Sequence, residues 1–123
     1  RERLSYGAEE TFASDIVKQG PLLEFLRDCA RRVFSELREE GKLARTVTLK
    51  IKYSDFQIVT RRCTREDFFP SPEEVYRAAC ALLERTEAGT RPVRLAGIAL
   101  SNFMPARQRA EWGTAPLFKK SDA

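Results

Sequence analysis

Histidine is absent from the 123-residue chain, and cysteine is scarce, with only Cys29, Cys63 and Cys80. Without histidine the chain has no Ser/His/Asp triad, no Cys/His dyad and no histidine-bearing zinc site. Three widely spaced cysteines with no C-x-x-C pair predict neither a disulfide framework nor a metal knuckle, so we expect reduced, mostly buried thiols. These absences exclude the histidine-based hydrolases and leave binding as the favoured class of function.

Long apolar runs and glycine-rich loops are also missing. No stretch approaches the roughly 18 apolar residues of a membrane span, and no signal-peptide pattern opens the chain. We therefore expect a cytoplasmic protein with no membrane partner and no phosphate-binding loop. The length suits one domain, and since the chain opens on Arg1-Glu2-Arg3 without an initiator Met, we expect a piece of a longer protein.

Adjacent glutamates occur three times but predict no catalytic or metal site. Glu73-Glu74 falls in the first turn of a predicted helix, where the helix dipole favours anions. Glu39-Glu40 falls at a solvated helix end, and Glu9 and Glu10, as neighbours on a strand, point to opposite faces. We expect neither a metal ion nor another cofactor in this chain.

Positive charge is concentrated in one short segment. The chain carries 22 Lys and Arg against 18 Asp and Glu, a net charge of +4. Residues 41–65 alone carry a net charge of +6, because seven basic residues there face only Asp55. Such a concentration indicates a surface that meets a polyanion.

The apolar pattern predicts four strands and two helices. The clearest alternation is at 46–53, where Val47, Leu49 and Ile51 point one way and Lys50 and Lys52 the other. A change of phase at Ala96-Gly97 predicts a β-bulge there. The predicted elements are a strand over 4–13, a helix from Pro21 to Gly41, strands over 46–53 and 56–64, a helix capped by Ser71 with Glu74 closing a capping box, and a strand over 93–101.

The order β-α-β-β-α-β predicts an α+β fold with an antiparallel or mixed sheet and both helices on one face. The opposite, open face would carry Lys50 and Lys52, together with Arg61 and Arg62 from across the hairpin. The RNA recognition motif has this element order but stacks bases on aromatic residues, whereas here cations and threonines (46, 48, 60 and 64) point outward. The open face therefore favours contact with a duplex backbone, with Gly7 offering a main-chain amide to a phosphate.

Four motifs in the chain resemble those of one known family. They are Ser5-Tyr-Gly-Ala-Glu-Glu-Thr-Phe12, Thr46-Val-Thr-Leu-Lys-Ile-Lys-Tyr-Ser-Asp-Phe56, Val59-Thr-Arg-Arg-Cys-Thr64 and Val93-Arg-Leu-Ala-Gly-Ile98. Together they are similar to the S-x-G-x-E-x-T-F, T-V-x-L-K-x-[RK]-Y-x-D-F, V-T-R-x-x-T and V-R-L-x-G-[VI] motifs of the little finger domain of Y-family translesion DNA polymerases, of the bacterial polymerase IV type. The likeness covers about residues 3–103.

The resemblance implies a reversed ferredoxin-like sheet with strand order 1-4-2-3, which grips double-stranded template–primer DNA independently of sequence. It further implies a bacterial, cytoplasmic, monomeric protein whose polymerase active site, with its Mg, lies in a palm domain outside this chain. The chain itself is expected to be no enzyme. The implied DNA-binding residues are Arg3, Ser5, Gly7, Lys50, Lys52, Thr60, Arg61, Arg62 and Thr64.

Residues 104–123 show no periodicity, and we expect a flexible tail after a domain that spans 1–103. Family members often end in a Q-L-x-L-F peptide that binds the sliding clamp. Here Leu117 and Phe118 match its end, while Thr114 and Ala115 depart from it. Pro116, Leu117 and Phe118 are therefore the candidate clamp-binding residues, the alternative being a chance dipeptide.

Two other functions stay open at this point. The first is an RNA- or metabolite-binding module on a ferredoxin-like sheet, which the strand order would separate from the leading hypothesis. The second is a recruitment domain of a catalytically inactive polymerase relative, which only the palm sequence would decide.

Overall fold

The computed structural model describes residues 4–105, which form four strands and two helices in the predicted order. The largest differences from the predicted bounds are at β2, which begins four residues earlier, and at β4, which runs on to Pro105. The elements are β1 (Tyr6–Ile16), α1 (Gln19–Glu39), β2 (Lys42–Tyr53), β3 (Ile58–Thr64), α2 (Pro72–Leu83) and β4 (Val93–Pro105).

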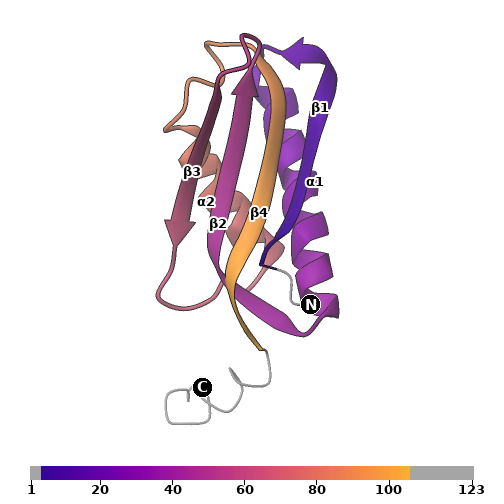
Figure 1. Ribbon diagram of the computed structural model, residues 1–123, viewed down its shortest axis with the longest axis vertical. Helices are drawn as coiled ribbons and strands as arrows, with labels where there is room; N and C mark the ends of the chain where they lie inside the picture. Colours follow the sequence, from indigo (N-terminus) through magenta and orange to yellow (C-terminus); the bar gives the residue numbers. More distant parts are fainter. Residues whose placement is uncertain (1–3, 106–123) are drawn as a thin grey trace.

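The four strands form one antiparallel sheet in the order β1-β4-β2-β3. Both helices lie behind the sheet in Figure 1, and they leave its front surface uncovered. The predicted α+β fold, the strand order and the placement of both helices on one face are confirmed. Among residues 4–105, no helix is long and apolar enough to cross a membrane.

Helix α1 packs one apolar stripe on the sheet. Leu22, Leu26, Val33 and Leu37 are each at most 1% exposed, and they recur at the three- and four-residue steps of a helix face. The helix begins two residues before Pro21, which is tolerated because amides in the first turn have no partner within the helix. Its end is as predicted, since Gly41 follows with a φ of +67°.

Helix α2 begins at the predicted cap. The Ser71 hydroxyl accepts a hydrogen bond from the Glu74 amide at 3.2 Å, and Pro72 is the first helical residue. The Glu74 carboxylate turns to Arg65 at 3.4 Å and Arg77 at 3.1 Å. It therefore ties the helix to the β3–α2 connection rather than completing a capping box.

The predicted bulge lies at a different place in β4. Pairing of β4 with β2 is regular through Ala96 and Gly97, from Leu43↔Met104 to Lys52↔Leu95, and it slips between Lys52 and Tyr53. The extra residue is thus Arg94. The prediction at Ala96-Gly97 was wrong because it assigned Leu95 to the side of the sheet that the helices cover, called the helix side. Leu95 instead pairs with Lys52 on the uncovered side, although its side chain is only 7% exposed.

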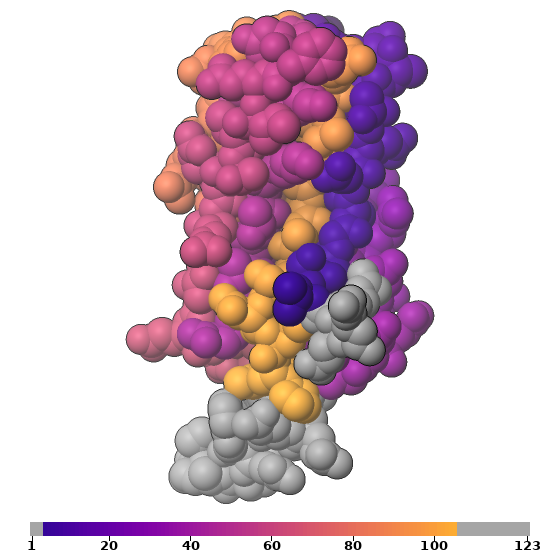
Figure 2. Space-filling view, viewed as in Figure 1, coloured from indigo at the N-terminus to yellow at the C-terminus, as the bar shows by residue number. Residues whose placement is uncertain are grey.

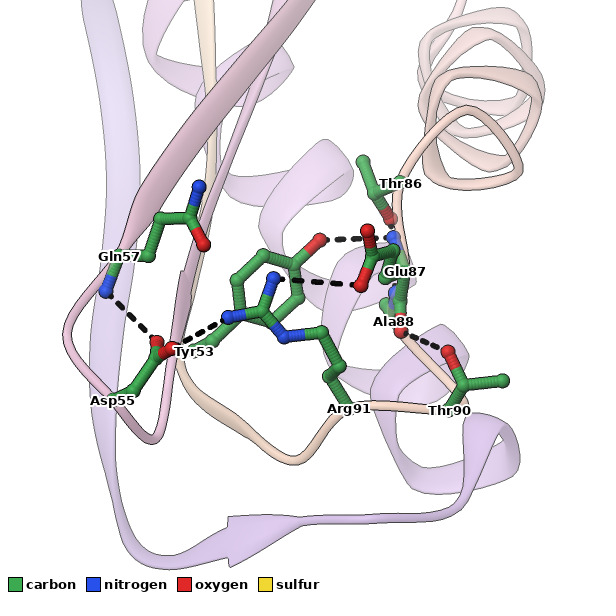
Figure 3. Close-up of polar contacts among 8 residues, drawn as sticks. All are labelled: Tyr53, Asp55, Gln57, Thr86, Glu87, Ala88, Thr90 and Arg91. Atoms are coloured by element: carbon green, nitrogen blue, oxygen red, sulfur yellow. Dashed lines mark hydrogen bonds and ion pairs between the residues drawn. The ribbon is translucent and has the colours of Figure 1, made fainter.

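A polar brace ties the β2–β3 turn to the segment before β4 (Figure 3). Arg91 reaches Asp55 at 2.8 Å and Glu87 at 3.4 Å, and its guanidinium lies 3.9 Å from the centre of the Tyr53 ring. The Tyr53 hydroxyl accepts a hydrogen bond from the Glu87 amide at 2.8 Å. This end of the sheet is therefore held by charged hydrogen bonds as well as by apolar packing.

Candidate nucleic-acid interface

The cross-strand register defines which side chains share the uncovered surface of the sheet, called the open face below. Directly paired residues point to the same side of the sheet. Leu49 and Ile51 are buried under the helices, so their partners point to the helix side and the alternate residues point to the open face. Figure 2 shows the open face, to which all four strands contribute side chains. Its rows, from β1 to β3, are Thr11–Leu95–Lys52–Ile58, Glu9–Gly97–Lys50–Thr60 and Gly7–Ala99–Thr48–Arg62.

The middle of the open face is lined by small residues. A hollow of about 360 Å³ lies there, walled by β1, β4, β2 and the start of β3, and its lining includes Gly7, Gly97 and Ala99. Packing explains one of the two glycines, Gly97, but not the other, Gly7. A Cβ on Gly97 would lie 2.4 Å from the Glu9 Cβ, so packing requires the glycine. A Cβ on Gly7 would meet nothing closer than 3.5 Å, so the packing leaves room for a side chain there.

Cations lie in and beside this hollow, and among residues 4–105 some of them form no ion pair. Lys50 pairs with Glu9 at 3.3 Å; because these residues lie on either side of Gly97, the bare glycine lets the pair form across β4. Among residues 4–105, no ion pair involves Lys52, Arg62 or Arg94. Three cations are therefore available to an anionic ligand.

Arg61 and Arg62 lie on opposite faces of the sheet, whereas the prediction placed both on the open face. Arg62 pairs with Thr48 on the open face, whereas Arg61 pairs with the buried Leu49 and lies on the helix side. At the exposed edge of the sheet, the Arg61 guanidinium donates to the carbonyl oxygen of Thr60 at 2.8 Å. Adjacent strand residues point to opposite sides of the sheet, and the family motif alone does not say which arginine points toward the ligand.

The threonines of the open face also divide into two groups. Thr60 is exposed beside Lys50. The Thr64 hydroxyl instead shares a hydrogen bond of 2.8 Å with Thr46, which also accepts one from the Asn102 side chain at 2.6 Å. Thr46 is fully buried, so the prediction of an exposed hydroxyl there was wrong.

Several predicted residues lie at or beyond the ends of the described chain. Ser5 is exposed just before β1. Arg3 and the tail residues Pro116, Leu117 and Phe118 lie outside the described residues. Within residues 4–105, no cluster of three or more Cys, Asp or Glu could hold a metal ion.

Three residues of this surface escaped the sequence reasoning. Glu9 is the partner of Lys50, Arg94 is the bulge residue, and Phe56 is an exposed aromatic residue in the β2–β3 turn. Glu9 could have been found from its phase with Gly7 once the strand order was adopted. No sequence pattern pointed to Arg94 or Phe56, because the directions of their side chains depend on the β4 bulge and on the β2–β3 turn.

Comparison with known proteins identifies the family. A model of the impB/mucB/samB family C-terminal domain matches residues 3–111. The chain belongs to this family. Two curated relatives, both DNA polymerase IV, are 42% identical over 104 residues (Alkalilimnicola ehrlichii) and 38% identical over 111 residues (Halorhodospira halophila).

These relatives are much longer than the chain. The matches cover 85% and 90% of this chain but only 29% and 31% of the two relatives. The chain therefore corresponds to the C-terminal domain of such polymerases, and it spans about three tenths of their length. The predicted resemblance to the little finger domain is confirmed.

Solved structures show the same fold. An insertion ternary complex of Dbh DNA polymerase has a TM-score of 0.72 and 17% identity, covering 82% of this chain and 29% of that chain. A complex of the beta-clamp processivity factor and the little finger domain of PolIV has a TM-score of 0.64 and 21% identity, covering 82% of this chain and 90% of that chain. At these identities the likeness establishes the architecture alone.

Proposed function

We propose that this domain binds the sugar–phosphate backbone of template–primer duplex DNA through its open face, independently of sequence, as part of a translesion DNA polymerase. The observation that carries the proposal is a pair of cations that form no ion pair within residues 4–105, Lys52 and Arg62, in rows that line or flank a hollow of small residues on a sheet face that no helix covers. Family membership and the polymerase relatives support the same interpretation.

The chemistry of the face suits phosphates better than bases. Its centre lacks the aromatic pairs on which single-strand readers stack bases; Thr48, Lys50, Gly97 and Ala99 stand there instead. Lysine, arginine and threonine bind phosphate oxygens without reading the sequence. Gly7 supports this function, because neither its φ nor its packing demands a glycine, while a missing side chain lets a ligand approach the backbone of an edge strand.

A salt titration of duplex affinity tests the proposal. If about three to five phosphates are neutralised, the slope of log K against log [salt] lies near −3 to −4.5. Fluorescence anisotropy with two labelled duplexes of unrelated sequence should give affinities within about tenfold of each other. An affinity that ignores salt, or one that strongly prefers a single sequence, would contradict backbone binding.

A second proposal concerns the sliding clamp. One solved neighbour is a little finger domain in complex with a beta-clamp processivity factor, and Leu117-Phe118 places two large apolar residues side by side in a tail otherwise rich in basic and small residues. Adjacent apolar anchors often dominate the affinity of a short peptide. We propose that Pro116, Leu117 and Phe118 dock on the clamp, which a titration of clamp against the chain tests directly.

Nucleotide transfer is assigned to other parts of the parent polymerase, with Mg as its expected cofactor. The purified chain should therefore extend no primer. Extension that persists after rigorous purification would contradict the assignment.

A further inference from the structure

The β2–β3 turn carries an aromatic residue in a position that usually holds glycine. The Phe56 amide donates to the Tyr53 carbonyl at 2.8 Å, and the Tyr53 amide donates to the Gln57 carbonyl at 2.9 Å. Phe56 itself has a φ of +70°. This is a tight turn closed by a left-handed residue, a place where glycine or asparagine is adopted at lower cost than phenylalanine.

Burial does not explain the choice of phenylalanine. The Phe56 side chain is 59% exposed, and its neighbour Ile58 is 49% exposed. The turn is already held without the ring, since Asp55 accepts from the Gln57 amide at 3.1 Å and binds Arg91 at 2.8 Å (Figure 3). The backbone conformation disfavours phenylalanine and the core does not include its ring, so the reason for the ring is to be sought in what surrounds it on the surface.

Two unpaired cations lie against this ring. The Lys52 ammonium is 5.4 Å and the Arg94 guanidinium 4.7 Å from the centre of the Phe56 ring. Lys52 belongs to the open face, and Arg94 is the extra residue of the β4 bulge. A bulge redirects a side chain, so two separate irregularities, the turn and the bulge, converge on one partly exposed cluster.

We propose that Lys52, Phe56 and Arg94, called the turn cluster, form a further contact with the sugar–phosphate backbone of duplex DNA at the hairpin end of the open face. The inference rests on the proposed function and extends it to Phe56 and Arg94, for which the resemblance implied no role. Lys52 and Arg94 bind phosphates, and the Phe56 ring covers the apolar face of a deoxyribose. A polyanion is favoured over a protein surface because neither cation has an acidic partner among residues 4–105.

Phe56→Asn and Phe56→Gly test the ring. Both residues suit the left-handed position, so the melting temperature should hold or rise while duplex affinity falls about five- to tenfold. The salt slope should stay at the wild-type value, since no charge is removed. Val17→Asn is the matched control, because Val17 is likewise exposed, at 60%, and lies in the β1–α1 connection.

Arg94→Gln tests the charge. Its salt slope should become shallower by about one. Arg85→Gln is the control, since it removes the same charge from an exposed position just after α2, and its slope should stay near the wild-type value. Equal slopes for Arg94→Gln and Arg85→Gln would overturn the assignment of Arg94.

The outcomes distinguish a failure of the turn cluster from a failure of the proposed function. If the wild-type chain binds duplex with the expected salt slope and both Phe56 variants bind equally well, the turn cluster is overturned while the proposed function stands, and the ring then belongs to a protein contact. If the wild-type chain shows no salt-dependent affinity, the proposed function fails and the turn cluster fails with it.

Discussion

Substituting Gly97 by alanine should disrupt the junction between β1 and β4. The added Cβ would lie 2.4 Å from the Glu9 Cβ, 2.8 Å from the Ala8 carbonyl oxygen and 2.9 Å from the Glu9 Cα, all of them on β1. Carbon atoms in contact normally stay about 3.5–4.0 Å apart, so β1 must retreat by about 1 Å. Two of these three atoms belong to the backbone, and a change of rotamer at Glu9 therefore cannot relieve the clash.

The cost follows from that displacement. Overpacking of this kind costs about 1–3 kcal/mol, and stretching β1–β4 hydrogen bonds by about 1 Å takes them beyond bonding distance, at about 1 kcal/mol each. We expect a loss of about 2–4 kcal/mol in the free energy of unfolding, and a fall in Tm of about 10 °C or more.

Urea unfolding followed by far-UV circular dichroism measures this loss, and Gly7→Ala is its control. Gly7 lies on the same strand pair, and its added Cβ would meet only Ala99 and Ile98 atoms at 3.5 Å or beyond, so its stability should stay within about 0.5 kcal/mol of wild type. Equal stabilities for Gly97→Ala and wild type, or equal losses for the two variants, would refute the reasoning from packing.

Three further predictions concern the ligand surfaces and the core. Arg62→Ala should make the salt slope of duplex binding shallower by about one, while Arg61→Ala, on the helix side, should change it less; equal effects would contradict the face assignment. Replacing both Leu117 and Phe118 by alanine should abolish clamp binding in a titration and leave Tm unchanged, whereas a lowered Tm would place the tail on the core. Burial raises the pKa of the Cys29 thiol to about 11, so iodoacetamide at pH 8 should alkylate the half-buried Cys63 and Cys80 first. Mass spectrometry measures the three alkylation rates, and equal rates would contradict this prediction.

The sequence was most informative where one side of an element is buried. Val47, Leu49 and Ile51 are fully buried, as their alternation predicted, and the Ser71 cap follows from local chemistry. The strand order came from the resemblance rather than from the pattern, because alternation says which residues face the core and not which strands are neighbours.

The candidate site was harder to predict because it depends on contacts between distant parts of the chain. The ion pair of Glu9 with Lys50 requires β4 to lie between β1 and β2, and it requires a glycine at the crossing point. Arg61 was placed wrongly because β3 is an edge strand, where both sides remain partly exposed and the alternation of apolar residues is weak. The bulge at Arg94 was misplaced because a buried leucine occurs on the open face as well.

The motif residues therefore divide by physical role rather than by position in the chain. Gly97 and Asp55 maintain the domain, the first by letting β1 approach β4 and the second by anchoring the β2–β3 turn to Arg91. Gly7 and Phe56 are different, since the fold needs neither the missing side chain of the one nor the exposed ring of the other. A residue that the fold does not require, on a face bearing unpaired cations, is best explained by what binds there. Substitutions in the first group should lower stability and DNA affinity together, whereas substitutions in the second should lower affinity alone.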